Sequence, residues 1–293
     1  LLSASKVIGI MRKLKFVLNR RCLNQIYISY VRPLLEYSSI VWAGCTDQQS
    51  VSLERIQNEA ARVVTGLTRS VSLNNLYKEC GWASLQHRRE MQKCYFMYKV
   101  YNSLVPQYVL DLFPINVNER STYELRNPEN FTVPFSRTTI MQKSCIPSGI
   151  SLWNGLDTNV KLSSSFLSFK GTIRNASNTL VPPFYSHGIR ILAVQHARIR
   201  NSCSNLNVHL FYNHLSTSPL CIFCNSIEDA EHYFFVCRRF QTQRLDFFNE
   251  TRTFHPLSTK KLLYGIDFYS NEDNCKLFEA VHKYIKCTKR FQE

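Results

Sequence analysis

Glycine is scarce in this chain, with nine among 293 residues. Loops that cradle phosphate groups, such as the P-loop and the dinucleotide-binding turn, depend on glycine because it lets the backbone approach the phosphates closely. The sequence contains neither pattern, and it contains no nucleophile elbow. These absences argue against a nucleotide-dependent enzyme or a serine hydrolase.

Long apolar runs are also missing. No stretch of about 20 apolar residues could span a bilayer. A secretory signal peptide is not indicated either, because Leu1 leads within a few residues into Lys6, Arg12, Lys13 and Lys15. Since the first residue is leucine and not methionine, we expect the chain to continue a longer reading frame.

Cysteine is plentiful, with eleven residues, but its distribution is unlike a disulfide framework. The number is odd, and eight of the cysteines are widely scattered, namely Cys22, Cys45, Cys80, Cys94, Cys145, Cys203, Cys275 and Cys287. Secreted domains that depend on disulfides are usually short and dense in cysteine. We therefore expect reduced, mostly packed thiols in an intracellular protein.

Basic residues clearly outnumber acidic ones. There are 36 Lys and Arg against 21 Asp and Glu, so the formal net charge is +15. Residues 1–35 contain no acidic residue but seven basic ones, which are Lys6, Arg12, Lys13, Lys15, Arg20, Arg21 and Arg32. Such a field attracts polyanions, of which nucleic acid is the most common. An anionic membrane surface remains the alternative partner.

A potential metal site lies between residues 219 and 240. Cys221, Cys224, His232 and Cys237 follow the spacing C-x2-C-x7-H-x4-C. Two cysteines three positions apart can share one ion from a tight turn, and a later His and Cys complete a tetrahedron. Because all four positions are filled by protein, the pattern predicts structural Zn²⁺ with no place for a substrate. The alternative is ordinary packing of four buried side chains.

Basic and aromatic residues accompany this segment. Arg238 and Arg239 follow the last cysteine directly, and Arg244 comes shortly after. Exposed aromatic rings beside arginine can stack on unpaired bases and hold phosphates. The candidate rings are Phe223, Tyr233 and Phe234. Each of these could equally pack the small core around the metal.

Hydrophobic periodicity predicts a mainly α fold. A first region, 1–110, carries apolar residues at helical spacing, namely Leu23, Ile26, Tyr30, Leu34 and Val41, with a kink expected at Pro33. Thr46 and Gln49 form a capping-box pattern, and Ser84 is placed to begin another helix. Further helices are expected near 189–201, 236–250 and 272–288.

The middle of the chain differs in composition. Four prolines, Pro114, Pro128, Pro134 and Pro147, interrupt residues 111–150. Phe131–Val133 and Thr138–Ile140 are candidate short strands. We therefore divide the chain into a helical region expected to bind nucleic acid (1–110), an irregular connector (111–183) and a helical C-terminal region (184–293) that contains the zinc knuckle.

Several segments, in order, resemble one known family. Tyr30-Val-Arg-Pro-Leu-Leu-Glu-Tyr37, followed by Val41-Trp42, is similar to the stretch just after the polymerase palm in reverse transcriptases of non-LTR (LINE-type) retrotransposons. Ser148-Gly-Ile-Ser-Leu-Trp-Asn154 resembles a downstream segment. Leu206-Asn-Val-His-Leu210 and Ser218-Pro-Leu220 resemble the lead into the C-terminal CCHC zinc knuckle. The likeness covers nearly the whole chain.

The resemblance implies the thumb, linker and zinc-knuckle portion of an RNA-directed DNA polymerase. Its partners would be template RNA, target DNA and the missing catalytic palm and fingers, and its site of action would be the nucleus. The family's palm carries paired aspartates that hold two Mg²⁺ ions, and no Asp-Asp pair exists here. We therefore expect no catalysis and no small-molecule substrate. A free-standing nucleic-acid-binding protein derived from such an element is the alternative.

Overall fold

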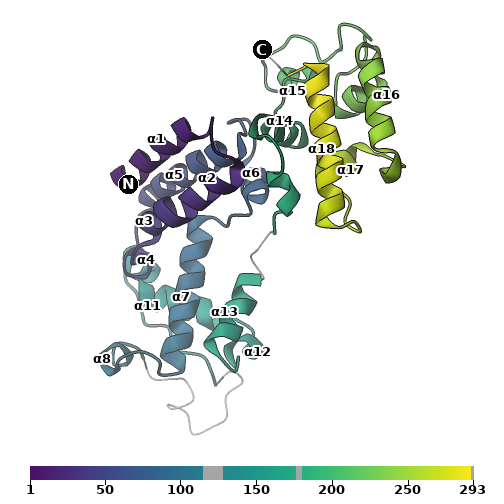
Figure 1. The fold of residues 1–293 in the computed structure, drawn as a ribbon. Helices are drawn as coiled ribbons and strands as arrows, with labels where there is room; N and C mark the ends of the chain where they lie inside the picture. The colour runs from purple at the N-terminus through teal and green to yellow at the C-terminus, as the bar shows by residue number, and fades with distance from the viewer. Residues whose placement is uncertain (115–127, 176–179, 292–293) are drawn as a thin grey trace. The chain divides into compact units, whose positions relative to one another are not determined.

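The computed structural model describes residues 1–114, 128–175 and 180–291. Within these ranges the chain is mainly helical, which confirms the predicted fold class (Figure 1). β structure in the same ranges is limited to isolated bridges, such as the antiparallel pair Leu220 and Ile227. None of the described helices is both long enough and apolar enough to cross a membrane.

The chain forms two compact units, each assembled from separate stretches of sequence. The first comprises Leu1–Ser5, Tyr30–Gln57 and the described residues of Trp82–Thr179. The second comprises Lys6–Ser29, Asn58–Gly81 and the described residues of Leu180–Glu293. The three-part division expected from sequence stays a prediction, and 115–127 and 176–179 of its connector lie outside the described residues.

The first unit is organised around one long helix. Its helices are α3 (Arg32–Glu36), α4 (Ser39–Trp42), α7 (Leu85–Tyr101), α8 (Gln107–Leu110), α10 (Thr139–Lys143), α11 (Cys145–Asn154), α12 (Thr158–Lys161) and α13 (Phe166–Asn175). α11 and α13 both pack against α7, as Figure 1 shows. Trp153 and Phe169 are fully buried there, and the Trp153 indole N–H donates to the Glu129 carbonyl oxygen at 2.8 Å.

The second unit contains the whole predicted metal segment, residues 219–240. Its helices are α2 (Arg20–Ile26), α6 (Leu73–Cys80), α14 (Arg190–Arg200), α15 (Asn207–Tyr212), α16 (Gln241–Glu250), α17 (Thr259–Tyr264) and α18 (Asn271–Thr288). α14, α16 and α17 pack around α18. Two further helices, α1 (Leu2–Leu14) and α5 (Asp47–Thr65), have residues in both units.

The described residues also include short helical turns that are not α-helical. Two are π-helical, Tyr27–Val31 and His232–Val236. Three are 3₁₀ turns, at Pro183–Ser186, Arg238–Phe240 and Arg252–Phe254.

The predicted helix starts are confirmed by side-chain caps, of which the one at Thr46 is reciprocal. The Gln49 amide N–H donates to Thr46 Oγ1 at 3.3 Å, and the Thr46 N–H donates to Gln49 Oε1 at 3.0 Å. Ser84 Oγ accepts from the His87 N–H at 3.1 Å at the start of α7. Each bond satisfies a donor that the first helical turn leaves without a backbone partner.

The end of α5 depends on glycine and two arginines. Gly66 has φ +75°, and a Cβ there would lie 2.5 Å from Val194 Cγ1, so only glycine fits without strain. Arg190 donates to the carbonyl oxygens of Val63 and Val64, and Arg198 donates to that of Gly66 at 2.9 Å. These guanidinium groups satisfy the carbonyls that a helix C-terminus leaves free.

The apolar stripe predicted over 23–41 was wrong in register. Leu23, Tyr27, Val31 and Leu35 are buried, whereas Tyr30, Leu34 and Val41 are mostly exposed. The π-helical turn Tyr27–Val31 lies between α2 and α3, and its extra residue per turn makes the buried positions recur every four residues. Pro33 lies at the start of α3, directly after the π-helical turn, so the backbone N–H that proline lacks falls at the junction of the two helical segments.

The two predicted short strands were also wrong. Thr138 caps α10 by accepting from the Met141 N–H at 3.3 Å, so residues 139–143 are helical. Phe131 has its backbone bonds met by a side chain: Asn154 accepts from its N–H at 3.1 Å and donates to its carbonyl at 2.8 Å. Phe131 is a single β-bridge residue, and Thr132 and Val133 are irregular, so the expected three-residue strand does not form.

Candidate metal centre

The first two candidate ligands lie on a tight turn. The Leu220–Ile227 bridge holds the turn at its base, and the Cys221 N–H donates to the Ser226 carbonyl at 2.8 Å. The Asn225 N–H donates back to the Cys221 carbonyl at 2.9 Å, with Asn225 at φ +52°. Asparagine tolerates this left-handed conformation better than most residues. The turn directs both Cys221 and Cys224 to the same side.

The other two candidates flank a π-helical turn. The Cys237 N–H donates to the His232 carbonyl at 2.8 Å, five residues away, so His232 and Cys237 face the same side of the wide turn. Asp229 begins this turn by accepting from the His232 N–H at 2.7 Å. Asp229 and the π-helical turn therefore place the His232 and Cys237 side chains close together.

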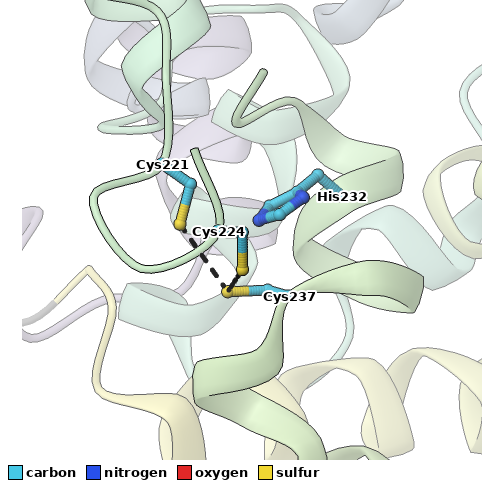
Figure 2. Close-up of side chains that lie close together, drawn as sticks. All are labelled: Cys221, Cys224, His232 and Cys237. Atoms are coloured by element: carbon cyan, nitrogen blue, oxygen red, sulfur yellow. Dashed lines mark hydrogen bonds between the residues drawn. The ribbon is translucent and has the colours of Figure 1, made fainter. Parts of the chain in front are cut away.

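Figure 2 shows the four side chains converging on one point. One ligand atom from each of Cys221, Cys224, His232 and Cys237 lies within 4.8 Å of the others. Cys237 Sγ is 3.9 Å from Cys221 Sγ and 3.9 Å from Cys224 Sγ. Zn–S bonds of about 2.3 Å in a tetrahedron place sulfurs about 3.8 Å apart, whereas a disulfide joins them at about 2.05 Å. The spacing fits a metal ion and not a disulfide.

One imidazole nitrogen of His232 is free for the ion. His232 Nδ1 lies 3.1 Å from Ser226 Oγ. His232 Nε2 is buried and has no hydrogen-bond partner. A buried nitrogen without a partner costs free energy unless it has another ligand. We therefore assign Nε2 as the metal ligand, with Nδ1–H donating to Ser226, the arrangement that fixes the ring in metal sites.

The thiols lie in different electrostatic environments. The Arg238 backbone N–H donates to Cys224 Sγ at 3.3 Å, and this hydrogen bond lowers the pKa of Cys224. Burial raises the pKa of Cys237 to about 12. A buried thiol of that kind becomes a thiolate only when a cation binds it. Without a bound cation Cys237 therefore stays a neutral thiol.

The metal turn is part of a larger core and not an isolated finger. Tyr233 and Phe234, between His232 and Cys237, are fully buried. The Tyr233 hydroxyl lies 2.7 Å from Thr288 Oγ1, and the Tyr284 hydroxyl donates to the Tyr233 carbonyl at 2.8 Å. Both partners are on α18. These two rings are packing residues, so neither can stack on a base.

The third aromatic candidate is exposed. Phe223 lies between the first two cysteines with 53% of its surface accessible. The Arg239 guanidinium is 4.7 Å from the centre of its ring. Arg238 and Arg239 are both exposed, whereas Arg244 is partly buried and donates to the Cys237 carbonyl. Phe223, Arg238 and Arg239 therefore form one exposed surface, which we call the knuckle surface.

The predicted N-terminal basic residues have different surroundings. Lys6, Arg12, Lys13 and Arg21 are exposed, and Lys15 is half-buried. Arg12 forms an ion pair with Glu59 at 2.8 Å.

Arg20 belongs to a buried charge cluster. Its guanidinium donates to the Glu79 carboxylate at 2.8 Å, and Arg200 donates to the same carboxylate at 2.9 Å. The three side chains are almost fully buried. Because its charge is engaged by Glu79, we leave Arg20 out of the proposed nucleic-acid surface. Nothing in the local sequence of Arg20 distinguishes it from exposed Arg21.

Sequence reasoning also missed the residues that support the ligands. Ser226 and Asp229, which orient His232, lie between the second cysteine and the histidine. Polar residues inside a ligand spacing are a usable signal, because ligating histidines commonly donate their other ring N–H to a nearby oxygen.

Comparison with known proteins adds no relative. No protein-family model, no curated protein and no solved structure matches the chain.

Proposed function

We propose that the chain binds one structural Zn²⁺ through Cys221, Cys224, His232 and Cys237, and that it binds nucleic acid around this centre. The observation that carries the proposal is the convergence of the four ligand atoms beside an exposed aromatic ring and two exposed arginines. When bound, the ion would hold the turn and the π-helical segment together. No coordination position would remain for a substrate.

The knuckle surface suits an unpaired nucleotide. The exposed Phe223 ring can stack on a base of any sequence, while Arg238 and Arg239 hold neighbouring phosphates. The exposed lysines and arginines near the N-terminus would add phosphate contacts that carry no sequence information. The net charge of +15 supports a polyanionic partner.

We further propose that the chain is the non-catalytic C-terminal portion of a non-LTR retrotransposon reverse transcriptase, acting in the nucleus. The support is the ordered series of sequence likenesses that ends at the knuckle. On this proposal a separate palm and fingers region supplies catalysis, and template RNA and target DNA are the partners. The second candidate is a free-standing zinc nucleic-acid-binding protein derived from such an element.

The knuckle surface can be tested by paired substitutions. R238A with R239A should weaken binding of a labelled single-stranded RNA more than binding of the matching duplex. The control pair, K260A with K286A, removes the same charge from exposed lysines of the same unit. Fluorescence anisotropy would give both affinities. Equal losses from the two pairs, or an undiminished affinity after zinc is stripped by a chelator, would contradict the proposal.

A further inference from the structure

The turn between α1 and α2 exposes two large apolar side chains. Phe16 is 81% exposed and Val17 is 83% exposed. The turn itself is well bonded: the Val17 N–H donates to the Leu14 carbonyl at 3.0 Å, and the Leu18 N–H donates to the same oxygen at 2.8 Å. Asn19 then caps α2 by accepting from the Cys22 N–H at 2.9 Å. The turn therefore has an ordered backbone, but the Phe16 and Val17 side chains point into solvent and are not packed in the core.

The residues that flank this turn in sequence carry positive charge and no negative charge. Lys13 and Arg21 are exposed on either side, and Lys15 Nζ lies 5.0 Å from the centre of the Phe16 ring. Residues 1–35 contain no Asp or Glu. The acid that pairs with α1, Glu59, is already shared between Arg12 and Arg69. A ligand at the turn would therefore meet cations and an aromatic face on a stretch of chain that carries no acidic residue.

We propose that this turn is a second single-strand contact, in which Phe16 stacks on an unpaired base while Lys13, Lys15 and Arg21 hold the flanking phosphates. The inference rests on the proposed nucleic-acid binding but uses a different surface from the knuckle. An aromatic face beside cations matches the alternation of base and phosphate along a strand. Two side chains offer too little apolar area for stable anchoring in a lipid surface.

The chain offers a matched control in Phe268. This ring is 97% exposed, in the same unit, but it follows Asp267 and precedes Glu272 and Asp273 at the start of α18. Its ring is even more exposed than that of Phe16, while the charge of the neighbouring residues has the opposite sign. Phosphate should avoid it.

The test compares single-stranded RNA with the matching duplex by anisotropy at two salt concentrations. F16A should weaken single-strand binding about tenfold, which lies within the range for loss of one stacked base. It should leave the duplex affinity and the salt dependence unchanged, because no charge is lost.

The other variants separate stacking from apolar contact and from charge. F16W should keep the affinity for the single strand and show quenched fluorescence on binding, whereas F16L should resemble F16A. K13A with K15A should reduce the single-strand salt slope by about 1.4. F268A should change nothing.

The outcomes separate this inference from the proposed function. If the unaltered chain binds no RNA, both fail. If it binds RNA and F16A binds the strand as well as the unaltered chain does, or F16L restores binding, the stacking inference alone fails. Loss of binding to phosphatidylserine vesicles in F16A, with RNA affinity unchanged, would overturn it in favour of a membrane surface.

Discussion

At the scale of single residues, the arrangement around His232 carries the metal assignment. Ring nitrogen Nε2 has no protein partner, while Nδ1 is held by Ser226. On the proposed assignment, Nε2 would bind the ion, and Nδ1–H would donate to the Ser226 hydroxyl. This separation was not visible from the spacing of the ligands alone.

We expect substitutions at these two positions to reduce zinc affinity by different amounts. S226A should weaken it roughly 10- to 100-fold, as is usual for the partner of a ligating histidine. H232A should weaken it further because a ligand is lost, and H232C should retain the ion because thiolate is an alternative fourth ligand. Competition with a coloured chelator measures all three. An S226A affinity equal to that of the unaltered chain would contradict the assigned orientation.

The buried carboxylate of Glu79 has an equally specific role. Burial by itself would raise the pKa of Glu79, but the Arg200 and Arg20 guanidinium groups outweigh it, so the pKa lies below its ordinary value. E79Q would leave both guanidinium groups buried without a counter-charge. We expect a loss of about 3–5 kcal/mol in unfolding free energy, measured by denaturant titration. E272Q, which removes an exposed carboxylate, should cost less than about 1 kcal/mol.

At the scale of elements, local signals predicted better than long-range ones. The Thr46–Gln49 cap and the Ser84 cap were readable because each is complete within four residues. The π-helical turn at Tyr27–Val31 was not readable, so the buried face over 23–35 was misplaced by one residue. The Asn154 amide that hydrogen-bonds both backbone groups of Phe131 is 23 residues away, beyond any local pattern.

A pair of buried histidines links α14 and α18. His196 Nδ1 lies 3.3 Å from His282 Nε2, and the other His196 nitrogen lies 2.9 Å from the Leu262 carbonyl. Burial, the His187 imidazole and Arg200 lower the pKa of His282 to about 4, although Glu279 opposes this. Burial, Arg200 and His282 lower the pKa of His196 well below 6.5. From sequence these histidines were indistinguishable from surface residues.

The sign of the resulting pH dependence follows from linkage. Both folded-state pKa values lie below the unfolded value, so protons bind preferentially to the unfolded chain. The stability is therefore complete above about pH 6.5 and is lost as the pH falls from there toward 4. For His282 alone we expect a loss of about 2 kcal/mol by pH 5. Denaturant titrations between pH 5 and 7.5 measure it, and a flat profile would contradict the buried, neutral pair.

At the scale of the whole molecule, the composition predicts a polyanionic partner but does not show which surface would bind it. The charge of +15 is spread over exposed residues such as Lys13 and engaged ones such as Arg20. Only contacts between distant segments separate the two groups, because Glu79 lies 59 residues from Arg20. The mainly helical class and the proximity of the four candidate metal ligands, by contrast, were predictable from periodicity and spacing.

The absence of an aspartate pair leads to a whole-molecule expectation about catalysis. With primer–template, Mg²⁺ and deoxynucleotides, the isolated chain should extend no primer, because the sequence has no Asp-Asp pair to hold the two metal ions. A gel-based extension assay measures this. Template-dependent extension that co-purifies with the chain and survives removal of contaminating polymerases would show a catalytic site outside the proposed account.

The most direct measurement of the central claim is the metal content of the reduced, purified chain. Elemental analysis by mass spectrometry should find about one zinc per chain, and C224S should lose it while C275S, a cysteine outside the centre, should keep it. Because Tyr233 and Phe234 join the metal turn to the core of the second unit, loss of zinc should also destabilise that unit. A reduced chain with no bound metal, or a C224S variant that retains its zinc, would contradict the account.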